Sequence, residues 1–322
     1  MASPHDGASG TGDDRHSALE ETPWTRRRIL KIAGLGLLGL AAAGTGVVEL
    51  VDHGDLPGKT VLDVIDGACS VADPSYAGVV PGPLASGEFE SEARHKRVGW
   101  TIAYPPGHRP GDHLPVCLVL HGWGVTHSEA FAGMRLQYPL ATVIGGMQAR
   151  PFVLAAADGG NGYWHAHGDD DPLAMLHDEF LPLLVSSGLD CAAGRPPATF
   201  GWSMGGYGSL LYGATYPTEV AAVTADDPAI WLSWPQAHAA NPTAFTSAAD
   251  FSAHDIVTNS KRLAGVPVQV RGGVSDPFAP STVVLQHELG PTRVILSKGC
   301  HTSPFMLAAA PLLLAFAGAH LA

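Results

Sequence analysis

The chain has 322 residues, with 18 basic and 30 acidic side chains, a formal net charge of −12 and 46% hydrophobic residues. This composition excludes a disordered acidic chain, which would be much less hydrophobic, and argues against nucleic acid as a partner, because phosphates attract basic patches. The length suits an α/β domain of about 250 residues behind a shorter N-terminal segment.

The N-terminal segment resembles an export signal. The run Thr25-Arg26-Arg27-Arg28-Ile29-Leu30-Lys31 precedes the uncharged residues 32–48. A basic region before an apolar region is typical of secretory signals, and paired arginines indicate the twin-arginine route of bacteria. We therefore expect residues 1–43 to engage the twin-arginine translocase, and the protein to be secreted or to reside in the cell envelope. A membrane anchor is the alternative, although seventeen Gly-rich residues are marginal against the roughly 20 that a span needs.

Residues 44–86 are interrupted by prolines and are interpreted as an N-terminal extension, and residues 87–322 as the main domain. Two antiparallel strands are expected first, around Phe89 and at 98–104. Continuous apolar runs follow, of the type found in strands covered on both faces. These runs lie at 116–120, 152–156, 199–202, 220–224, 266–270 and 293–296. Helical spacing separates them, at 127–144, 172–186, 204–215, 279–289 and 302–317. This alternation predicts an α/β fold, a mainly parallel sheet with helices on both faces.

Two further features qualify this outline. The stretch 227–263 is longer than a crossover needs, and we expect an insertion above the C-terminal edge of the sheet, where such folds bind ligands. The cysteines are Cys69, Cys117, Cys191 and Cys300. In an oxidising compartment they allow three pairings, although the apolar surroundings of Cys117 favour a buried free thiol. There is no C-x-x-C motif, so a zinc site of that kind is not expected.

The residues Gly201-Trp202-Ser203-Met204-Gly205 match G-x-S-x-G. A predicted strand precedes the motif and a predicted helix follows it, which is the setting of a nucleophile elbow. The turn holds serine in a strained conformation, and side chains at 201 and 205 would clash, so glycine is needed there. We therefore interpret Ser203 as a nucleophile rather than as part of a plain Gly-Ser turn.

A serine nucleophile needs a base, an acid and donors for an oxyanion. In this type of fold the chain order is serine, acid, histidine. His301, just after the last predicted strand, is preferred as the base over His238, His254, His287 and His320. Asp276, after the strand at 266–270, is the leading acid, with Asp226 and Asp227 as rivals. The backbone N–H groups of Trp123, in His121-Gly122-Trp123-Gly124, and of Met204 are the expected oxyanion donors.

The segment 158–171 is rich in His and Asp but matches no standard metal motif, so no metal is predicted there. Its aromatic residues Tyr163 and Trp164 are expected to line a substrate pocket, together with Trp231 and Phe278. No organic or metal cofactor is expected.

These motifs resemble those of the α/β-hydrolases, and more narrowly of the esterase family that includes S-formylglutathione hydrolases, feruloyl and acetylxylan esterases and the antigen 85 mycolyltransferases. The resemblance covers roughly residues 87–322 and rests on the motifs around Trp123, Ser203, Asp276 and His301, and on Asp158-Gly159-Gly160. It implies an α/β-hydrolase fold with Ser203 as nucleophile, Asp276 as acid and His301 as base.

The expected function is an exported serine carboxylic-ester hydrolase that acts through an acyl-enzyme on a small-molecule, lipid or polysaccharide ester. Two alternatives are an acyltransferase on the same triad and a non-catalytic cell-surface binding domain. The sequence leaves open the ester, the disulfide pairing and the oligomeric state.

Overall fold

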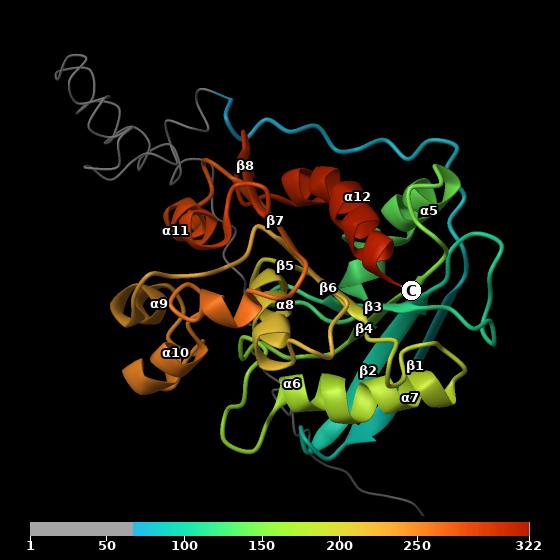
Figure 1. The fold of residues 1–322 in the computed structure, drawn as a ribbon, viewed down its shortest axis with the longest axis horizontal. Coiled ribbons are helices and arrows are strands. Elements are labelled where there is room, and N and C mark those ends of the chain that lie inside the picture. Colours follow the sequence, from blue (N-terminus) through green and yellow to red (C-terminus); the bar gives the residue numbers. More distant parts are fainter. Residues whose placement is uncertain (1–66, 322) are drawn as a thin grey trace, which may run out of the picture. The chain divides into compact units, whose positions relative to one another are not determined.

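The computed structural model describes residues 67–321 (Figure 1). The predicted export signal and residues 44–66 of the predicted extension lie outside the described residues. Within the described part, eight strands form one sheet in the order β1-β2-β4-β3-β5-β6-β7-β8. Their bounds are β1 Leu84–Ser91, β2 Lys96–Ala103, β3 Val116–Leu120, β4 Val153–Ala157, β5 Ala198–Trp202, β6 Ala222–Asp226, β7 Val268–Gly273 and β8 Val294–Ser297.

Strand direction follows the prediction. β1 pairs antiparallel with β2, and β2 antiparallel with β4, whereas β4, β3, β5, β6, β7 and β8 are all parallel. After β3 the chain moves to β4 on one side, and β5 then returns to the other side of β3. The carboxyl ends of β3 and β5 therefore flank a topological switch point, the usual ligand site of an open α/β sheet.

The central strands are apolar throughout because both faces of the sheet are covered. Every residue of β3, β4, β5 and β6 is buried. Along β3, Val116, Leu118 and Leu120 belong to one hydrophobic core, while Cys117 and Val119 belong to the other. This alternation follows from the two-residue period of a strand.

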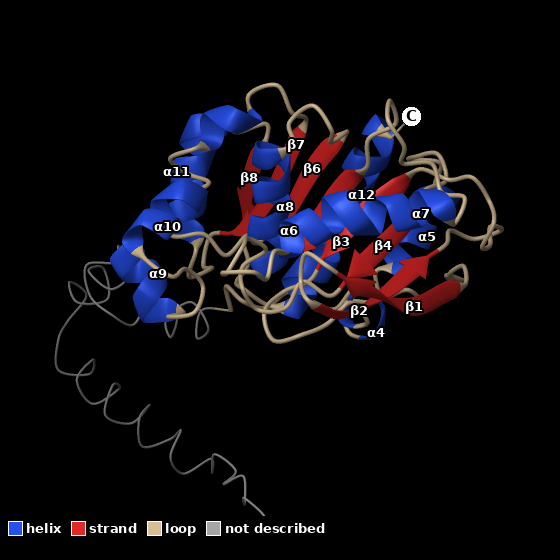
Figure 2. Cartoon of the chain, turned by 90° about the horizontal axis from the view of Figure 1, so that it is seen from below, coloured by secondary structure: helices blue, strands red, loops and turns tan. Residues whose placement is uncertain are grey.

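Helices cover both faces of the sheet (Figure 2). The first core takes side chains from α8 (Met204–Thr215), α11 (Ala279–Leu289) and the continuous run of α6 (Pro172–Ala174), the π-helix η1 (Met175–Phe180) and α7 (Leu181–Ser186). The second takes them from α4 (Glu129–Ala132), α5 (Gln137–Gly145) and α12 (Ser303–His320). Among the described helices, α12 is long and apolar enough to cross a membrane, but half of it is buried in this core, which accounts for its composition.

Several boundaries differ from the prediction. Strands β6 and β7 begin two residues later than expected, at Ala222 and Val268. The helix expected at 127–144 is divided into α4 and α5, because Arg135 between them takes a left-handed conformation with φ 45°. A helix cannot pass through such a residue. Strand β1 begins at Leu84, so the last residues of the predicted extension belong to the sheet.

The stretch 227–263 contains α9 (Trp234–Ala240), α10 (Ala248–His254) and the 3₁₀ helix η2 (Ser260–Leu263). Phe245 and Phe251 of this stretch lie in the first core. The Tyr207 hydroxyl of α8 donates a hydrogen bond of 2.9 Å to the His254 carbonyl. The insertion is therefore anchored to the helix that follows Ser203.

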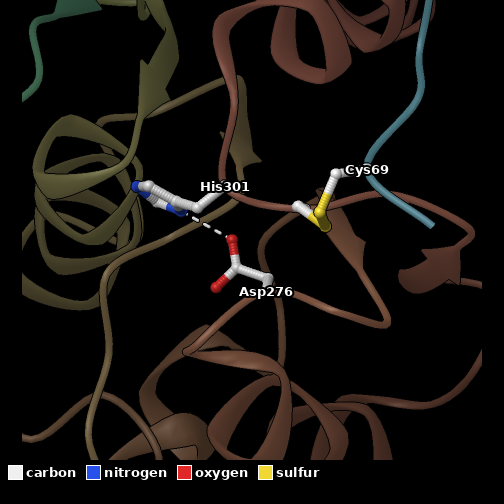
Figure 3. Close-up of a disulfide and its surroundings, with 4 residues drawn as sticks. Cys69, Asp276 and His301 are labelled. Atoms are coloured by element: carbon white, nitrogen blue, oxygen red, sulfur yellow. Dashed lines mark hydrogen bonds and ion pairs between the residues drawn. A yellow bond between two sulfur atoms is a disulfide. The ribbon is translucent and has the colours of Figure 1, made fainter. Parts of the chain in front are cut away.

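A disulfide joins Cys69 to Cys300, with a Cα–Cα distance of 5.0 Å, and Cys117 and Cys191 are buried free thiols. The chain after Cys69 lies against α5, where the Tyr76 ring stacks on Tyr138 at 5.5 Å, and against α12, where the Tyr76 hydroxyl donates to the Leu307 carbonyl at 3.5 Å. The disulfide thus ties the segment before β1 to the loop after β8 (Figure 3).

Candidate active site

Ser203 occupies a sharp turn between the end of β5 and the start of α8, with φ 55° and ψ −120°. Positive φ is unusual for a residue with a side chain, and such strain persists only where the surroundings enforce it. A Cβ on Gly201 would lie 1.9 Å from the Gly205 carbonyl oxygen, and a Cβ on Gly205 would lie 1.9 Å from that of Leu120. The two glycines of the motif therefore make the turn possible.

Ser203, His301 and Asp276 lie in one chain of hydrogen bonds. The Ser203 hydroxyl donates to His301 Nε2 at 2.8 Å, and His301 Nδ1–H donates to Asp276 Oδ2 at 2.5 Å (Figure 3 shows the latter). Asp276 Oδ1 accepts the backbone N–H of Phe278 at 2.6 Å, which fixes the carboxylate. In this tautomer Nε2 can accept the serine proton, and the carboxylate can stabilise the resulting imidazolium.

Among the described residues, no histidine other than His301 contacts the Ser203 hydroxyl. His238 stacks on Trp234, His254 bonds Asp250, His287 lies beside Glu288 and His320 caps its own helix. The rivals for the base are therefore distributed over the insertion and the helices, away from the serine.

The rival acids Asp226 and Asp227 are buried close to Asp276. Asp227 Oδ1 accepts the Gly273 N–H at 2.8 Å, and a carboxyl oxygen of Asp227 lies within 4.8 Å of one of Asp276 and of a ring nitrogen of His301. Burial, with the negative charges of Asp276 and Asp226, raises the pKa of Asp227 to about 10. Burial also raises the pKa of Asp226 well above its usual range. Burial thus favours the protonated form of both rivals, and Asp276 is the carboxyl that contacts the imidazole.

The backbone N–H groups of Trp123 and Met204 lie at the switch point. Met204 is the first residue of α8, so its N–H is one of the free donors at a helix N-terminus, where the helix dipole favours negative charge. Leu120 pairs with Gly201 across β3 and β5, which brings the loop of Trp123 alongside Ser203. Within residues 67–321 neither N–H has a hydrogen-bond partner, so both are available to a substrate oxygen.

His121, in the same loop, has a structural position. It is fully buried, its Nδ1–H donates to the Gly122 carbonyl at 2.8 Å, and its Nε2 accepts the Gly159 N–H at 3.0 Å. Burial lowers the pKa of His121, which suits the neutral ring that these partners require. The side chain therefore locks the loop after β3 to the loop after β4.

Two more side chains of the loop after β4 hold the Trp123 loop. Asp158 belongs to a motif named from the sequence but had no predicted role, and Asn161 was not predicted. Asn161 Oδ1 accepts the Gly124 N–H at 2.7 Å, and Asp158 Oδ1 accepts the His127 N–H at 2.7 Å. The signal that could have identified them is their place after a strand adjacent to β3, where loops meet at one edge of a sheet.

The four predicted substrate contacts separate into different environments. Phe278 lies edge-on to the His301 ring, with centroids 5.2 Å apart, and Trp231 lies 5.5 Å from Phe278. Phe278 therefore borders the triad, and Trp231 packs against Phe278. Tyr163 is buried beside Trp231 at 5.0 Å and forms part of the wall behind it.

Trp164 differs from the prediction because it is fully buried. Its ring fills the space that a Cβ on Gly159 or Gly208 would occupy, and its Nε1–H donates to the His121 carbonyl at 3.2 Å. It therefore supports the loops from beneath and does not face a substrate.

Two groups of side chains in residues 67–321 have metal-ligand chemistry. One is Asp227, Asp276 and His301 of the triad, and the other is His165, Asp250 and His254. The triad group is already engaged in hydrogen bonds with Ser203 and the backbone.

No protein-family model matches the sequence, and no curated protein matches it. Solved structures match the fold. A ferulic acid esterase has a TM-score of 0.63 at 17% identity, covering 75% of this chain and all of that one. An S-formylglutathione hydrolase from Agrobacterium tumefaciens has a TM-score of 0.59 at 15% identity, covering 78% and 98%. The feruloyl esterase module from Clostridium thermocellum, complexed with sinapinate, has a TM-score of 0.55 at 16% identity, covering 76% and 92%. The chain therefore has the α/β-hydrolase fold.

Proposed function

We propose that this protein is a serine carboxylic-ester hydrolase. The observation that carries the proposal is the hydrogen-bond chain from Asp276 through His301 to Ser203, with the serine held at a strained elbow beside two free N–H groups. The esterases among the structural neighbours support the reaction class. The intact constellation is the reason to prefer an enzyme over a non-catalytic binding domain.

The mechanism follows from the positions of these groups. Ser203 Oγ attacks the ester carbonyl as His301 Nε2 takes its proton, and the N–H groups of Trp123 and Met204 stabilise the oxyanion. His301 then protonates the departing alcohol, which leaves an acyl-enzyme. Water, activated by the same imidazole, releases the acid and restores the serine.

Esters of aromatic acids are the first substrates to test. Phe278 lies edge-on to His301 and Trp231 packs against Phe278, and such rings pair with aromatic acyl groups in offset or edge-on geometry. Ferulate and sinapinate appear in the names of two structural neighbours, which supports the same choice. We expect methyl ferulate to be cleaved with a higher kcat/KM than a methyl ester of a short straight-chain acid.

The Ser203→Ala variant tests the reaction. We expect hydrolysis of p-nitrophenyl acetate to fall by at least about 10³-fold, because the nucleophile is lost, while the thermal unfolding midpoint stays close to that of the wild type. Ser187→Ala, an exposed serine at the end of α7, is the matched control and should retain activity. Unchanged hydrolysis by Ser203→Ala would disprove the assignment. Product analysis with trehalose as an added acceptor separates hydrolysis from acyl transfer.

We also propose export by the twin-arginine route, with the protein acting outside the cytoplasm. The arginine-rich run Arg26-Arg27-Arg28 motivates this location, and the Cys69–Cys300 disulfide supports it, because disulfides persist in oxidising compartments. Replacing Arg26 and Arg27 by lysine should retain the protein inside the cell. Normal export of that variant would refute the route.

A further inference from the structure

A second cluster of chemistry-bearing side chains lies outside the triad. His165 comes from the loop after β4, and Asp250 and His254 come from α10 of the insertion, spaced by four residues on one helix face. Their ligand atoms lie within 4.8 Å of one another. The distance to Asp250 Oδ1 is 3.7 Å from His165 Nδ1 and 2.9 Å from His254 Nδ1.

His165 is arranged as a ligand. Its Nε2–H donates to the Ala244 carbonyl at 2.9 Å, so Nδ1 carries the lone pair. This Nδ1 is buried and has no hydrogen-bond partner among the described residues. Metal-binding histidines characteristically donate their other ring N–H to a carbonyl or carboxylate in this way.

Asp250 is oriented toward the two rings. Its Oδ2 accepts the backbone N–H of Thr246 at 2.7 Å and the Thr246 hydroxyl at 2.9 Å, which leaves Oδ1 to face His165 and His254. The His165 lone pair and a carboxylate oxygen thus point at the same space with no proton between them. The His165 nitrogen and the Asp250 oxygen are both electron-rich, so their arrangement favours a cation between them.

We propose that His165, Asp250 and His254 form a binding site for a divalent transition metal ion, with Zn²⁺ as the best fit. Two imidazoles and a carboxylate suit zinc, whereas calcium and magnesium prefer all-oxygen sites. A tetrahedral zinc site places its ligand atoms about 3.3 Å apart, close to the two distances to Asp250 Oδ1. The rings of His165 and His254 stack with centroids 4.3 Å apart in the metal-free protein, so the His254 ring must rotate out of the stack for both Nδ1 atoms to coordinate one ion.

The proton balance of binding is simple. His254 Nδ1 bonds the Asp250 carboxylate and carbonyl, so this nitrogen carries the ring proton in the metal-free protein. On binding, His254 changes tautomer, its proton moves to Nε2 and Nδ1 coordinates the ion. The three side chains then hold the metal and a water completes four-coordination. The ion connects α10 to the loop after β4, which carries His165 and Tyr163. Its role is therefore to hold the insertion in place.

Zinc titration of protein without a histidine tag, after dialysis against EDTA, tests the site. We expect one equivalent of Zn²⁺ to bind by calorimetry and to raise the thermal unfolding midpoint. His254→Gln should weaken binding by at least about 10-fold, because one ligand is lost. His287→Gln removes a histidine that is 86% exposed on α11 and should bind zinc like the wild type.

Two further measurements keep the outcome decisive even if a variant folds poorly. The zinc X-ray absorption spectrum of the wild type should show imidazole nitrogen and oxygen ligands and no sulfur. The Ser203→Ala variant should bind zinc unchanged, which separates this site from the hydrolase chemistry. Absence of saturable binding, a sulfur-containing ligand set, unchanged affinity in His254→Gln, or loss of binding in His301→Gln alone would each overturn the proposal.

Discussion

At the scale of single residues, Asp227 and Asp276 show how burial gives two neighbouring carboxyls different roles. Asp276 accepts hydrogen bonds from His301 and from the backbone, whereas Asp227 is a neutral acid with a pKa of about 10. The folded protein therefore holds a proton on Asp227 that the unfolded chain has lost above pH 4. Since the folded pKa is the higher one, this contribution to stability is complete at acidic pH and is lost as the pH rises toward 10.

Asp227→Asn should reduce this pH dependence, because an amide is neutral at every pH. The free energy of unfolding should fall less steeply between about pH 5 and pH 9 than it does in the wild type. Urea denaturation at a series of pH values measures both slopes. Identical slopes would show that Asp227 is ionised in the folded protein.

Substitutions at Asp276 and Asp227 distinguish the roles of the two acids in catalysis. Asp276→Asn should lower kcat by about 10⁴-fold, since an amide does not stabilise the imidazolium or fix the histidine tautomer. Asp227→Asn should retain kcat within about 10-fold, because a neutral amide replaces a neutral acid. Steady-state hydrolysis of p-nitrophenyl acetate gives both values. A larger loss in Asp227→Asn would assign the role of the acid to Asp227.

The triad contacts could be predicted from the sequence because each residue follows a strand in the expected order. Trp164 could not be placed this way, because its burial depends on Gly159 of its own loop and on Gly208 of α8, which is distant in the sequence. The ligand set His165, Asp250 and His254 was missed for a similar reason. Its members belong to two segments, and the sequence does not show that the loop of His165 lies beside the helix of Asp250 and His254.

At the scale of elements, the turn from β5 to α8 is the most constrained part of the chain. Gly205 stands where any side chain would meet the Leu120 carbonyl of β3. The bounds of α8 agree with the prediction, since the helix was expected at 204–215 and runs from Met204 to Thr215. The division between α4 and α5 was not foreseen, because Arg135 carries no sequence signal for its left-handed conformation.

Gly205→Ala should lower both stability and activity, because the new Cβ forces α8 away from β3. Gly145→Ala, at the end of α5, is the matched control, since its Cβ would meet no atom within 4 Å. That change should leave hydrolysis unaltered and stabilise the helix by up to about 1 kcal/mol. Thermal unfolding and p-nitrophenyl acetate hydrolysis measure both variants. Full activity in Gly205→Ala would show that the elbow tolerates a side chain.

At the scale of the whole molecule, the order of helices and strands could be predicted from apolar runs and their spacing. The sheet follows directly, because short crossovers place successive parallel strands near one another. The disulfide pairing could not be predicted, since four cysteines allow three connectivities. It depends on how the segment after Cys69 lies over α12, which is set by contacts such as that of Tyr76 with the Leu307 carbonyl.

Replacing Cys69 and Cys300 together by serine should lower the stability of the whole domain. The bond closes a loop with a sequence separation of 231, for which chain entropy alone gives about 5 kcal/mol. The thermal unfolding midpoint should fall by about 10 °C. Adding a reductant should lower the wild-type midpoint toward that of the double variant and leave the variant unaffected. Equal midpoints for the oxidised wild type and the variant would contradict this.

The same bond makes residues 69–300 a closed covalent ring. The exposed turn around Gly194 lies inside this ring, between the Trp123 loop and Ser203. A protease that cuts this turn opens the ring but releases no fragment, because both pieces remain joined through the two sulfur atoms. The nicked protein therefore runs as one species on a non-reducing gel and as two on a reducing gel. Cleavage of this turn by surrounding proteases thus leaves the oxyanion donors and the triad on a single, covalently joined molecule.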